Sequence, residues 1–315
     1  MNDNHSSIPN KWHLNTPVVL IIFKRREQTQ KVLEVIRQVK PSQLFVIADG
    51  ARLEQPGERE KCLATREIVE TIDWECEVFK NYSEINLGTG KRISSGLDWV
   101  FDHTDRAIIL EDDCVPQFSF FPFCEELLER YQDDTRITSI AGQNFLLESS
   151  SYSYSYYFSN YSHCWGWATW KRAWNCFNFD MKLWTEVKNK NLLTKILSDP
   201  QAVNYWQEIF QSAYDNNKDT WAYPWLLSCW LQSGLNIHPR VNLVSNIGFG
   251  EEATHTFSPK SPLANMATKA IDFPLKHPPY IIRDSHRDNL LQKKVYEPNL
   301  SRKIKRQIKK ALKIS

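Results

Sequence analysis

Hydrophobic and polar positions follow two alternating periods through the first 117 residues. Short apolar runs of the length of a strand occur at 18–23, 44–48, 76–82 and 107–110. Between them, apolar residues recur at helical spacing, as with Val32, Val35, Ile36 and Val39 before Pro41, and again over 58–72 and 93–101. Strands that alternate with helices predict an α/β fold with a doubly wound, mainly parallel sheet.

Polar residues follow each of the four apolar runs. They are 24–26, 49–52, 86–91 and 111–113, and every group contains charges, glycines or both. Because ligands of such sheets collect where the carboxyl ends of parallel strands meet, we expect these four segments to share one site.

The second half of the chain has a less regular pattern. Helices are expected at 125–131, 203–214 and 221–231, a strand at 137–141, and loop or irregular β structure over the Tyr/Ser-rich stretch 149–161. We therefore divide the chain into a domain at 16–258, with a regular first half (16–117) and a Trp-rich second half (118–258). A wrapping segment or linker (259–300) follows, and then a basic amphipathic tail (301–315). This tail holds seven Lys/Arg and predicts either a solvated helix or contact with an anionic membrane surface.

Composition narrows the classes of function. The near balance of 39 Lys/Arg and 37 Asp/Glu argues against a nucleic-acid binder. The sequence lacks an apolar stretch long enough to span a membrane and a recognisable secretion signal, so it predicts a cytoplasmic protein, with peripheral contact at the inner membrane face left open. The twelve tryptophans, most of them after residue 164, indicate either platforms for sugar rings or a thick aromatic core.

Glu111, Asp112 and Asp113 are the strongest chemical signal. Three carboxylates at the end of a buried strand repel one another and need a cation to remain ionised together. One or two carboxylates, completed by water and phosphate oxygens, form the usual protein site for Mg²⁺ or Mn²⁺ at a diphosphate. The triplet therefore predicts Mn²⁺ or Mg²⁺ as a cofactor, in preference to a solvent-facing acidic turn.

The run from Ala107 to Phe118 resembles the strand, Glu-Asp-Asp and x-x-Pro-x-Phe signature of GT-A glycosyltransferases. It is most similar to the N-acetylglucosaminyltransferase I family and its bacterial relatives, which are nucleotide-diphospho-sugar transferases. The resemblance extends over about 16–257 through the segments 23–25, 49–50, 86–88, 163–170, 219–221 and 248–250.

The resemblance implies that 16–117 is the nucleotide-sugar-binding half and 118–258 the acceptor half, and it implies roles for individual residues. Asp113 would coordinate the metal, Asp112 would hold the donor ribose or a metal-bound water, and Glu111 would support both. The residues implied to bind the nucleotide-sugar are Phe23, Arg25, Asp49, Lys91, Glu111, Asp112, Trp165 and Gly166. His255, in a segment that resembles a closing loop, would reach the metal or the phosphates, and its alternative is a solvated loop histidine.

Asp219 is the candidate catalytic base. Inverting transfer needs a carboxylate that removes the proton from the acceptor hydroxyl, and Asp219 stands where the family has Asp-Asp-Trp. The match departs at the second acid, which is Thr220 here. The alternative is that Asp219 caps the helix expected at 221–231.

Together these features predict a metal-dependent, inverting transfer of sugar from a nucleotide-diphospho-sugar, with UDP-sugars favoured by the resemblance. The acceptor would be a glycan or a lipid-linked glycan, as in surface polysaccharide synthesis. One alternative is a nucleotidyltransferase, although segment 23–27 lacks the glycine-rich signature usual after the first strand. The other is a non-catalytic carbohydrate-binding protein, which would need neither the acidic triplet nor a base.

Overall fold

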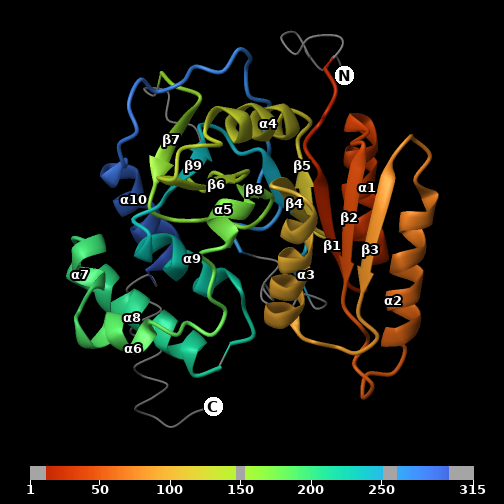
Figure 1. Ribbon diagram of the computed structural model, residues 1–315, viewed down its shortest axis with the longest axis horizontal. Coiled ribbons are helices and arrows are strands. Elements are labelled where there is room, and N and C mark those ends of the chain that lie inside the picture. Colours follow the sequence, from red (N-terminus) through yellow and green to blue (C-terminus); the bar gives the residue numbers. More distant parts are fainter. Residues whose placement is uncertain (1–11, 147–152, 217, 251–260, 298–315) are drawn as a thin grey trace.

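A computed structural model describes residues 12–146, 153–216, 218–250 and 261–297. Its centre is an eight-stranded sheet in the order β3-β2-β1-β4-β8-β6-β9-β7 (Figure 1). Six of these strands run in the same direction, and β8 and β7 run against them. The predicted α/β class with a mainly parallel sheet is confirmed.

The first half consists of the predicted strand–helix repeats. Its elements are β1 (Val18–Ile22), α1 (Arg26–Val39), β2 (Gln43–Ala48), α2 (Glu58–Arg66), the 3-10 turn η1 (Glu67–Thr71), β3 (Glu77–Tyr82), α3 (Thr89–His103) and β4 (Arg106–Glu111). The expected helix at 58–72 is thus the α-helix α2, which continues as the 3-10 turn η1. Strand β1 is buried throughout, as a central strand covered on both faces must be.

Helices cover both faces of this sheet. Residues Val18, Leu20 and Ile22 face α1 and α4 (Phe120–Arg130), whereas Val19 and Ile21 face α3 and a group of tryptophans. Alternate residues of one strand therefore enter two separate cores, which is the arrangement of a doubly wound sheet.

The second half extends the sheet. Strand β5 (Cys114–Pro116) pairs antiparallel with β10 (Val244–Asn246) in a separate two-stranded sheet. Strands β6 (Ile137–Ala141), β7 (Tyr156–Ser159), β8 (Trp167–Trp170) and β9 (Leu235–Pro239) continue the main sheet. Strand β7 lies within the Tyr/Ser-rich stretch that was expected to be loop or irregular β, and it forms the sheet edge against β9.

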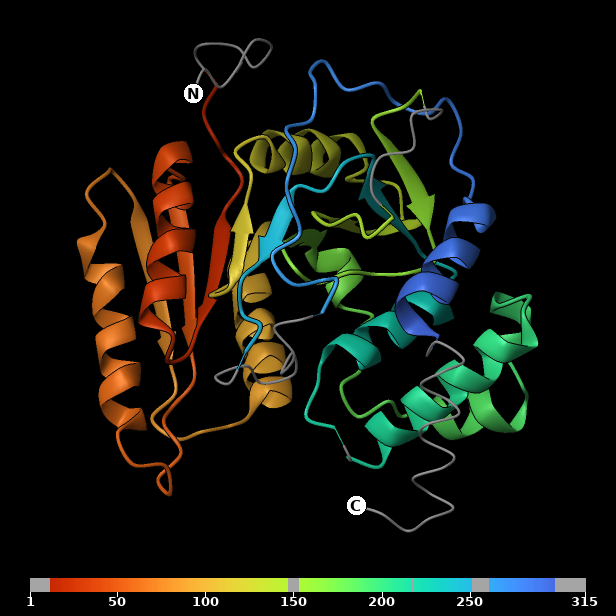
Figure 2. The same cartoon turned by 180° about the vertical axis from the view of Figure 1, so that it is seen from behind.

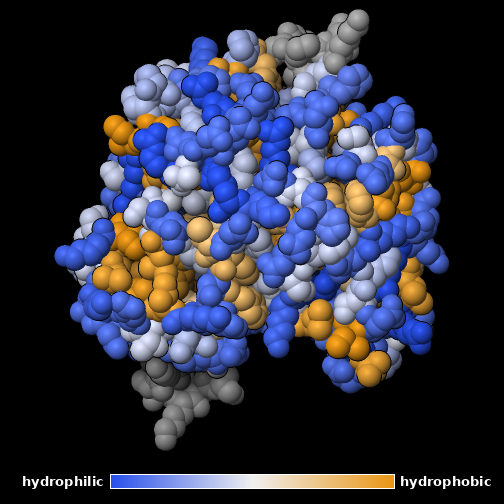
Figure 3. Space-filling model, in the orientation of Figure 1, coloured by the Kyte–Doolittle hydropathy of each residue, from blue (hydrophilic) through white to orange (hydrophobic). Residues whose placement is uncertain are grey.

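Helices α6 (Trp184–Asn189), α7 (Leu193–Ile196), α8 (Pro200–Tyr214) and α9 (Ala222–Leu231) surround a third core in this half (Figure 2). The short helix α5 (Lys171–Trp174) packs instead into the core that contains α3. Trp184, Trp206 and Trp230 fill the core beneath α6 and α8. An apolar area of the surface lies over α7 and α8 (Figure 3). Leu183, the residue before α6, is more than half exposed.

The segment expected to wrap or link, 259–300, is described from residue 261 to 297. Ile271 and Leu275 are buried in the main core, and the segment then forms α10 (Ser285–Leu291) and a π-helical turn η2 (Gln292–Tyr296). The carboxylate of Asp288 accepts hydrogen bonds from Ser159 Oγ and the Asn160 N–H, so α10 is fastened to the end of β7. The basic tail at 301–315 lies outside the described residues. Among the helices that are described, none is long and apolar enough to cross a membrane.

Candidate active site

The acidic triplet lies at the carboxyl end of β4, near the middle of the sheet. Glu111 is the last residue of β4 and pairs with Ile21 of β1, and Asp112 and Asp113 form the turn into β5. Asp112 and Asp113 are each only 7% exposed. The regular strand pattern that precedes them explains why this position could be predicted.

Burial and the neighbouring acids disfavour the charged forms of Glu111 and Asp112. Burial raises the pKa of Glu111, and Asp113 and Asp112 raise it further. The pKa of Asp112 is also raised by burial, although Arg25 opposes the shift. The cluster therefore gains from any additional positive charge placed among its carboxylates.

Arg25 supplies part of that charge. Its Nη1 lies 3.1 Å from Asp112 Oδ1 and 2.5 Å from Asp113 Oδ2. The backbone N–H of Phe23 donates to Asp112 Oδ2 at 3.3 Å. Burial lowers the pKa of Arg25, but the two aspartates more than compensate and the net shift is upward. The structure thus brings together five of the predicted residues, from the ends of β1 and β4.

A loop after β10 closes over Asp113. The Ile247 N–H donates to the backbone oxygen of Asp113 at 2.8 Å, and Asn246 Nδ2 lies 3.3 Å from Asp113 Oδ1. A Cβ atom at Gly248 would stand 1.9 Å from Asp113 Oδ2, so only glycine fits there. Asn246 was not predicted, because no local pattern connects it with an acid 133 residues earlier. His255 lies outside the described residues.

Asp49 lies at the end of β2 and is occupied by hydrogen bonds. It accepts from the N–H groups of Gly50, Leu87 and Gly88 at 2.9 to 3.1 Å and from Asn86 Nδ2 at 3.1 Å. Its pKa is raised by burial, which these donors oppose. Since β1 separates β2 from β4, and neighbouring strands are about 4.8 Å apart, Asp49 lies on the order of 10 Å from the acidic triplet.

Asp219, in the second half of the chain, contacts the start of α3. Its Oδ2 accepts from the Thr89 N–H and its Oδ1 from the Gly90 N–H, both at 2.7 Å. It does not cap the helix that follows it, because the N-cap of α9 is Trp221. Lys91 lies exposed in the first turn of α3, beside this contact.

Trp165 and Gly166 precede β8. Gly166 has φ +68°, and a Cβ atom there would lie 2.7 Å from Val244 Cγ2, so the position requires glycine for packing. Trp165 is partly exposed, and its ring contacts Phe145 and Phe249 edge-on with centroids 5.4 and 5.6 Å away. The other tryptophans from 167 to 230 are at most 3% exposed. The tryptophans from 167 to 230 therefore belong to the core, and Trp165 is the partly exposed ring beside them.

The donor set around Asp113 suits a divalent cation. Carboxylate oxygens are hard ligands, and one guanidinium leaves a surplus of negative charge when all three acids are ionised. Among the described residues, no three His, Cys, Asp or Glu side chains are arranged to hold a metal ion by themselves. A cation held here would take its remaining ligands from water and from a substrate, as Mg²⁺ commonly does.

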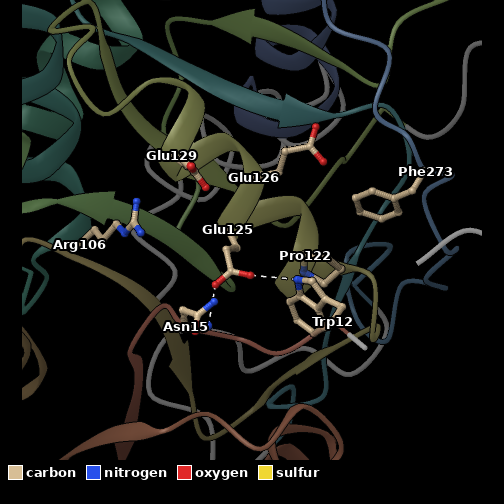
Figure 4. A pocket seen from close by; sticks show the side chains of 8 residues that line it. All are labelled: Trp12, Asn15, Arg106, Pro122, Glu125, Glu126, Glu129 and Phe273. Atoms are coloured by element: carbon tan, nitrogen blue, oxygen red, sulfur yellow. Dashed lines mark hydrogen bonds between the residues drawn. The ribbon is translucent and has the colours of Figure 1, made fainter. Parts of the chain in front are cut away.

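A separate hollow of about 360 Å³ lies near the amino end of β4, away from the acidic triplet (Figure 4). Its lining includes Arg106, the first residue of β4, and three glutamates of α4. Glu125 accepts hydrogen bonds from Trp12 Nε1 and from the Asn15 N–H, and so fastens the segment before β1 to α4. None of the predicted site residues lines this hollow, and ligands of parallel sheets bind at the other edge.

No model of a known protein family matches the sequence, and no curated protein matches it. Parts of the chain are similar to solved structures at low identity. HddC from Yersinia pseudotuberculosis is 9% identical over 49% of this chain and 77% of its own, with a TM-score of 0.31. An apo UDP-glucose pyrophosphorylase is 9% identical over 71% and 90%, with a TM-score of 0.34. The inositol-1-phosphate CTP transferase from T. maritima is 9% identical over 51% and 74%, with a TM-score of 0.29. Likeness at this level does not assign an activity to the chain.

Proposed function

We propose that this protein is a glycosyltransferase that uses Mn²⁺ or Mg²⁺ to bind a nucleotide-diphospho-sugar and transfers the sugar to a glycan or lipid-linked acceptor. One observation carries the proposal: three acids, two of which contact the guanidinium of Arg25, lie at the carboxyl end of β4 in a doubly wound sheet. Ligands of such sheets bind at this edge.

In this proposal Asp113, supported by Asp112, would hold the cation, which would supply electrostatic stabilisation to the departing diphosphate. Arg25, whose guanidinium contacts both aspartates, would bind the nucleotide together with Phe23. Asp49 orders the loop that carries Gly88, and so shapes the nucleoside end of the site. Lys91 is exposed and available to the ribose or phosphates.

Asp219 is proposed as the general base of an inverting reaction. The carboxylate is exposed, and each of its oxygens uses one lone pair for an amide of α3, which leaves the second lone pair available for a proton. The same two hydrogen bonds hold the carboxylate in a fixed orientation, which a base requires.

Product analysis tests the reaction class. The purified chain would be incubated with Mn²⁺ and UDP- or GDP-sugars, in parallel with a nucleoside triphosphate plus a sugar 1-phosphate. Release of nucleoside diphosphate that depends on Asp113 supports glycosyl transfer, because slow transfer to water reveals the bond that breaks. Release of pyrophosphate in the second mixture would replace the proposal with a nucleotidyltransferase.

A further inference from the structure

His163 is buried without a hydrogen bond. It is 5% exposed, and neither ring nitrogen has a partner among the described residues. The ring lies between Phe145 and His238, with centroids 4.6 and 4.4 Å away. Burial, followed by the neighbouring His238, lowers its pKa well below the ordinary value. The ring is therefore neutral, with one N–H donor and one acceptor nitrogen.

Gln143 adds a second unsatisfied group to the same segment. Its Oε1 accepts the Trp165 N–H at 2.9 Å, which fixes the orientation of the amide, and its Nε2 is buried without a partner among the described residues. The next residue, Asn144, is held by bonds to Pro239 O and Arg240 O. The backbone beside Gln143 is thus held in place, so the unsatisfied Gln143 Nε2 belongs to an ordered segment.

A continuous row of contacts connects these side chains to the acidic triplet. Gly248 presses on Asp113, the next residue Phe249 meets the ring of Trp165, and Trp165 meets Phe145, which covers His163. The thiol of Cys164, between His163 and Trp165, has its pKa raised by burial and then by Glu111 and Asp113. Successive contacts therefore connect the segment that carries the unsatisfied groups with the loop beside Asp113.

We propose that His163 and Gln143 form a subsite that binds hydroxyl groups of the acceptor sugar, with Trp165 as the adjoining wall. A hydroxyl both donates and accepts a hydrogen bond, so vicinal hydroxyls can satisfy a neutral imidazole and an amide at once. An ionic ligand would find no opposite charge on either side chain. The inference rests on the proposed function, since it names the ligand of the acceptor half of that site.

The free energy of unfolding gives the subsite a distinctive signature. A buried polar group without a partner destabilises the folded state, and replacing it with an apolar group of similar shape is neutral or stabilising. His238 is the matched control, because its Nε2 bonds Tyr161 O at 2.7 Å and its Nδ1 faces Tyr157 Oη at 3.5 Å. We expect His163→Phe to keep or raise the melting temperature and His238→Phe to lower it.

The test uses the full chain labelled with ¹⁵N-histidine. Imidazole ¹⁵N spectra would be recorded during titration with methyl glycosides of glucose, galactose, mannose and N-acetylglucosamine, with glycerol at matched hydroxyl concentration as the control solute. We expect one glycoside to shift the His163 signals saturably, and His163→Phe and Gln143→Met each to weaken its binding at least tenfold. His163→Leu serves as the second variant should His163→Phe fail to fold.

Two results would overturn the subsite. In the first, no glycoside shifts the His163 signals more than glycerol does. In the second, His163→Phe lowers the melting temperature as His238→Phe does and leaves glycoside binding unchanged. The second result is expected of a histidine whose ring is bridged by buried water. Binding of UDP-sugar with Mn²⁺, measured on the same samples, separates the two proposals. If nucleotide-sugar binds and glycosides do not, the subsite alone fails; if glycosides bind at His163 and nucleotide-sugar does not, the transferase proposal alone fails.

Discussion

Arg25 Nη1 lies 2.5 Å from Asp113 Oδ2, at the position where the sequence placed a metal ion. The guanidinium balances part of the negative charge of the triplet, and its planar group of donors is well suited to carboxylates. Arg25 was predicted to bind the nucleotide. Its guanidinium contacts both Asp112 and Asp113, so the charge balance of the triplet depends on it.

Stability of the metal-free protein should fall as the pH rises. The folded pKa of Glu111 and of Asp112 is raised, to about 8 and about 7, above the values of the unfolded chain. The folded state therefore holds more protons, and the stabilisation present below about pH 4 is lost as the pH rises through 8. We expect the melting temperature, followed by circular dichroism, to decline from pH 5 to 8.5 and Mn²⁺ to flatten that decline.

The variant Arg25→Gln should steepen the same decline, because it leaves two buried carboxylates without their counter-charge. Breaking a buried ion pair commonly costs about 3–5 kcal/mol. A variant whose melting temperature has the same pH dependence as the native protein would show that Arg25 does not balance the triplet.

Gly248→Ala should abolish metal-dependent nucleotide binding and destabilise the protein. The added methyl group would lie 1.9 Å from Asp113 Oδ2, and overpacking of this kind costs about 1–3 kcal/mol. Gly57→Ala is the control: its φ of +76° strains the backbone of an alanine, but its Cβ would meet nothing within 4 Å. Calorimetry on both variants should find lost binding in the first and native binding in the second.

Asp219→Ala should reduce turnover by two orders of magnitude or more and flatten the acidic limb of the pH–rate profile, as loss of a general base does. The same change removes two hydrogen bonds from the start of α3 and should cost about 1 kcal/mol, the typical value of a cap. If stability falls while the shape of the pH profile is retained, Asp219 positions α3 and is not the base.

Trp165 and Trp167 should respond in opposite ways to replacement with leucine. Trp165 is partly exposed, so Trp165→Leu should weaken acceptor binding with little loss of stability. Trp167 is 1% exposed and stacks on Trp221 with centroids 5.2 Å apart, so Trp167→Leu should destabilise the protein by about 3 kcal/mol or more. Denaturant unfolding and glycoside titration of the two variants check this contrast.

The elements that the sequence predicted well are those with a strong local period. Strands β1, β2 and β4 are buried apolar runs, and the acids that end β4 follow directly from the chain. Strand β7 was less clear, because its residues Tyr156 to Ser159 are all buried and show no alternation. Helix α10 lies in the segment 259–300, which was expected to wrap or link, and long-range hydrogen bonds such as that from Ser159 to Asp288 hold it in place.

The contacts that shape the site are mostly long-range and could not be read from local patterns. Asp219 meets α3 across 129 residues, and Asn246 meets Asp113 across 133. The role of Gly248 depends on the position of Asp113, which no spacing along the chain reveals. The tryptophans also needed the structure, because composition alone does not distinguish a buried ring such as Trp225 from an open one such as Trp165.

The central claim is that Asp113 holds a cation that binds a nucleotide diphosphate. Isothermal titration with UDP-sugars and GDP-sugars, with and without Mn²⁺, tests it most directly when the native chain is compared with Asp113→Asn, which keeps the size of the side chain. We expect one nucleotide-sugar to bind only with Mn²⁺, and Asp113→Asn to weaken this binding at least 100-fold. Binding of equal strength without Mn²⁺, or in the variant, would contradict it.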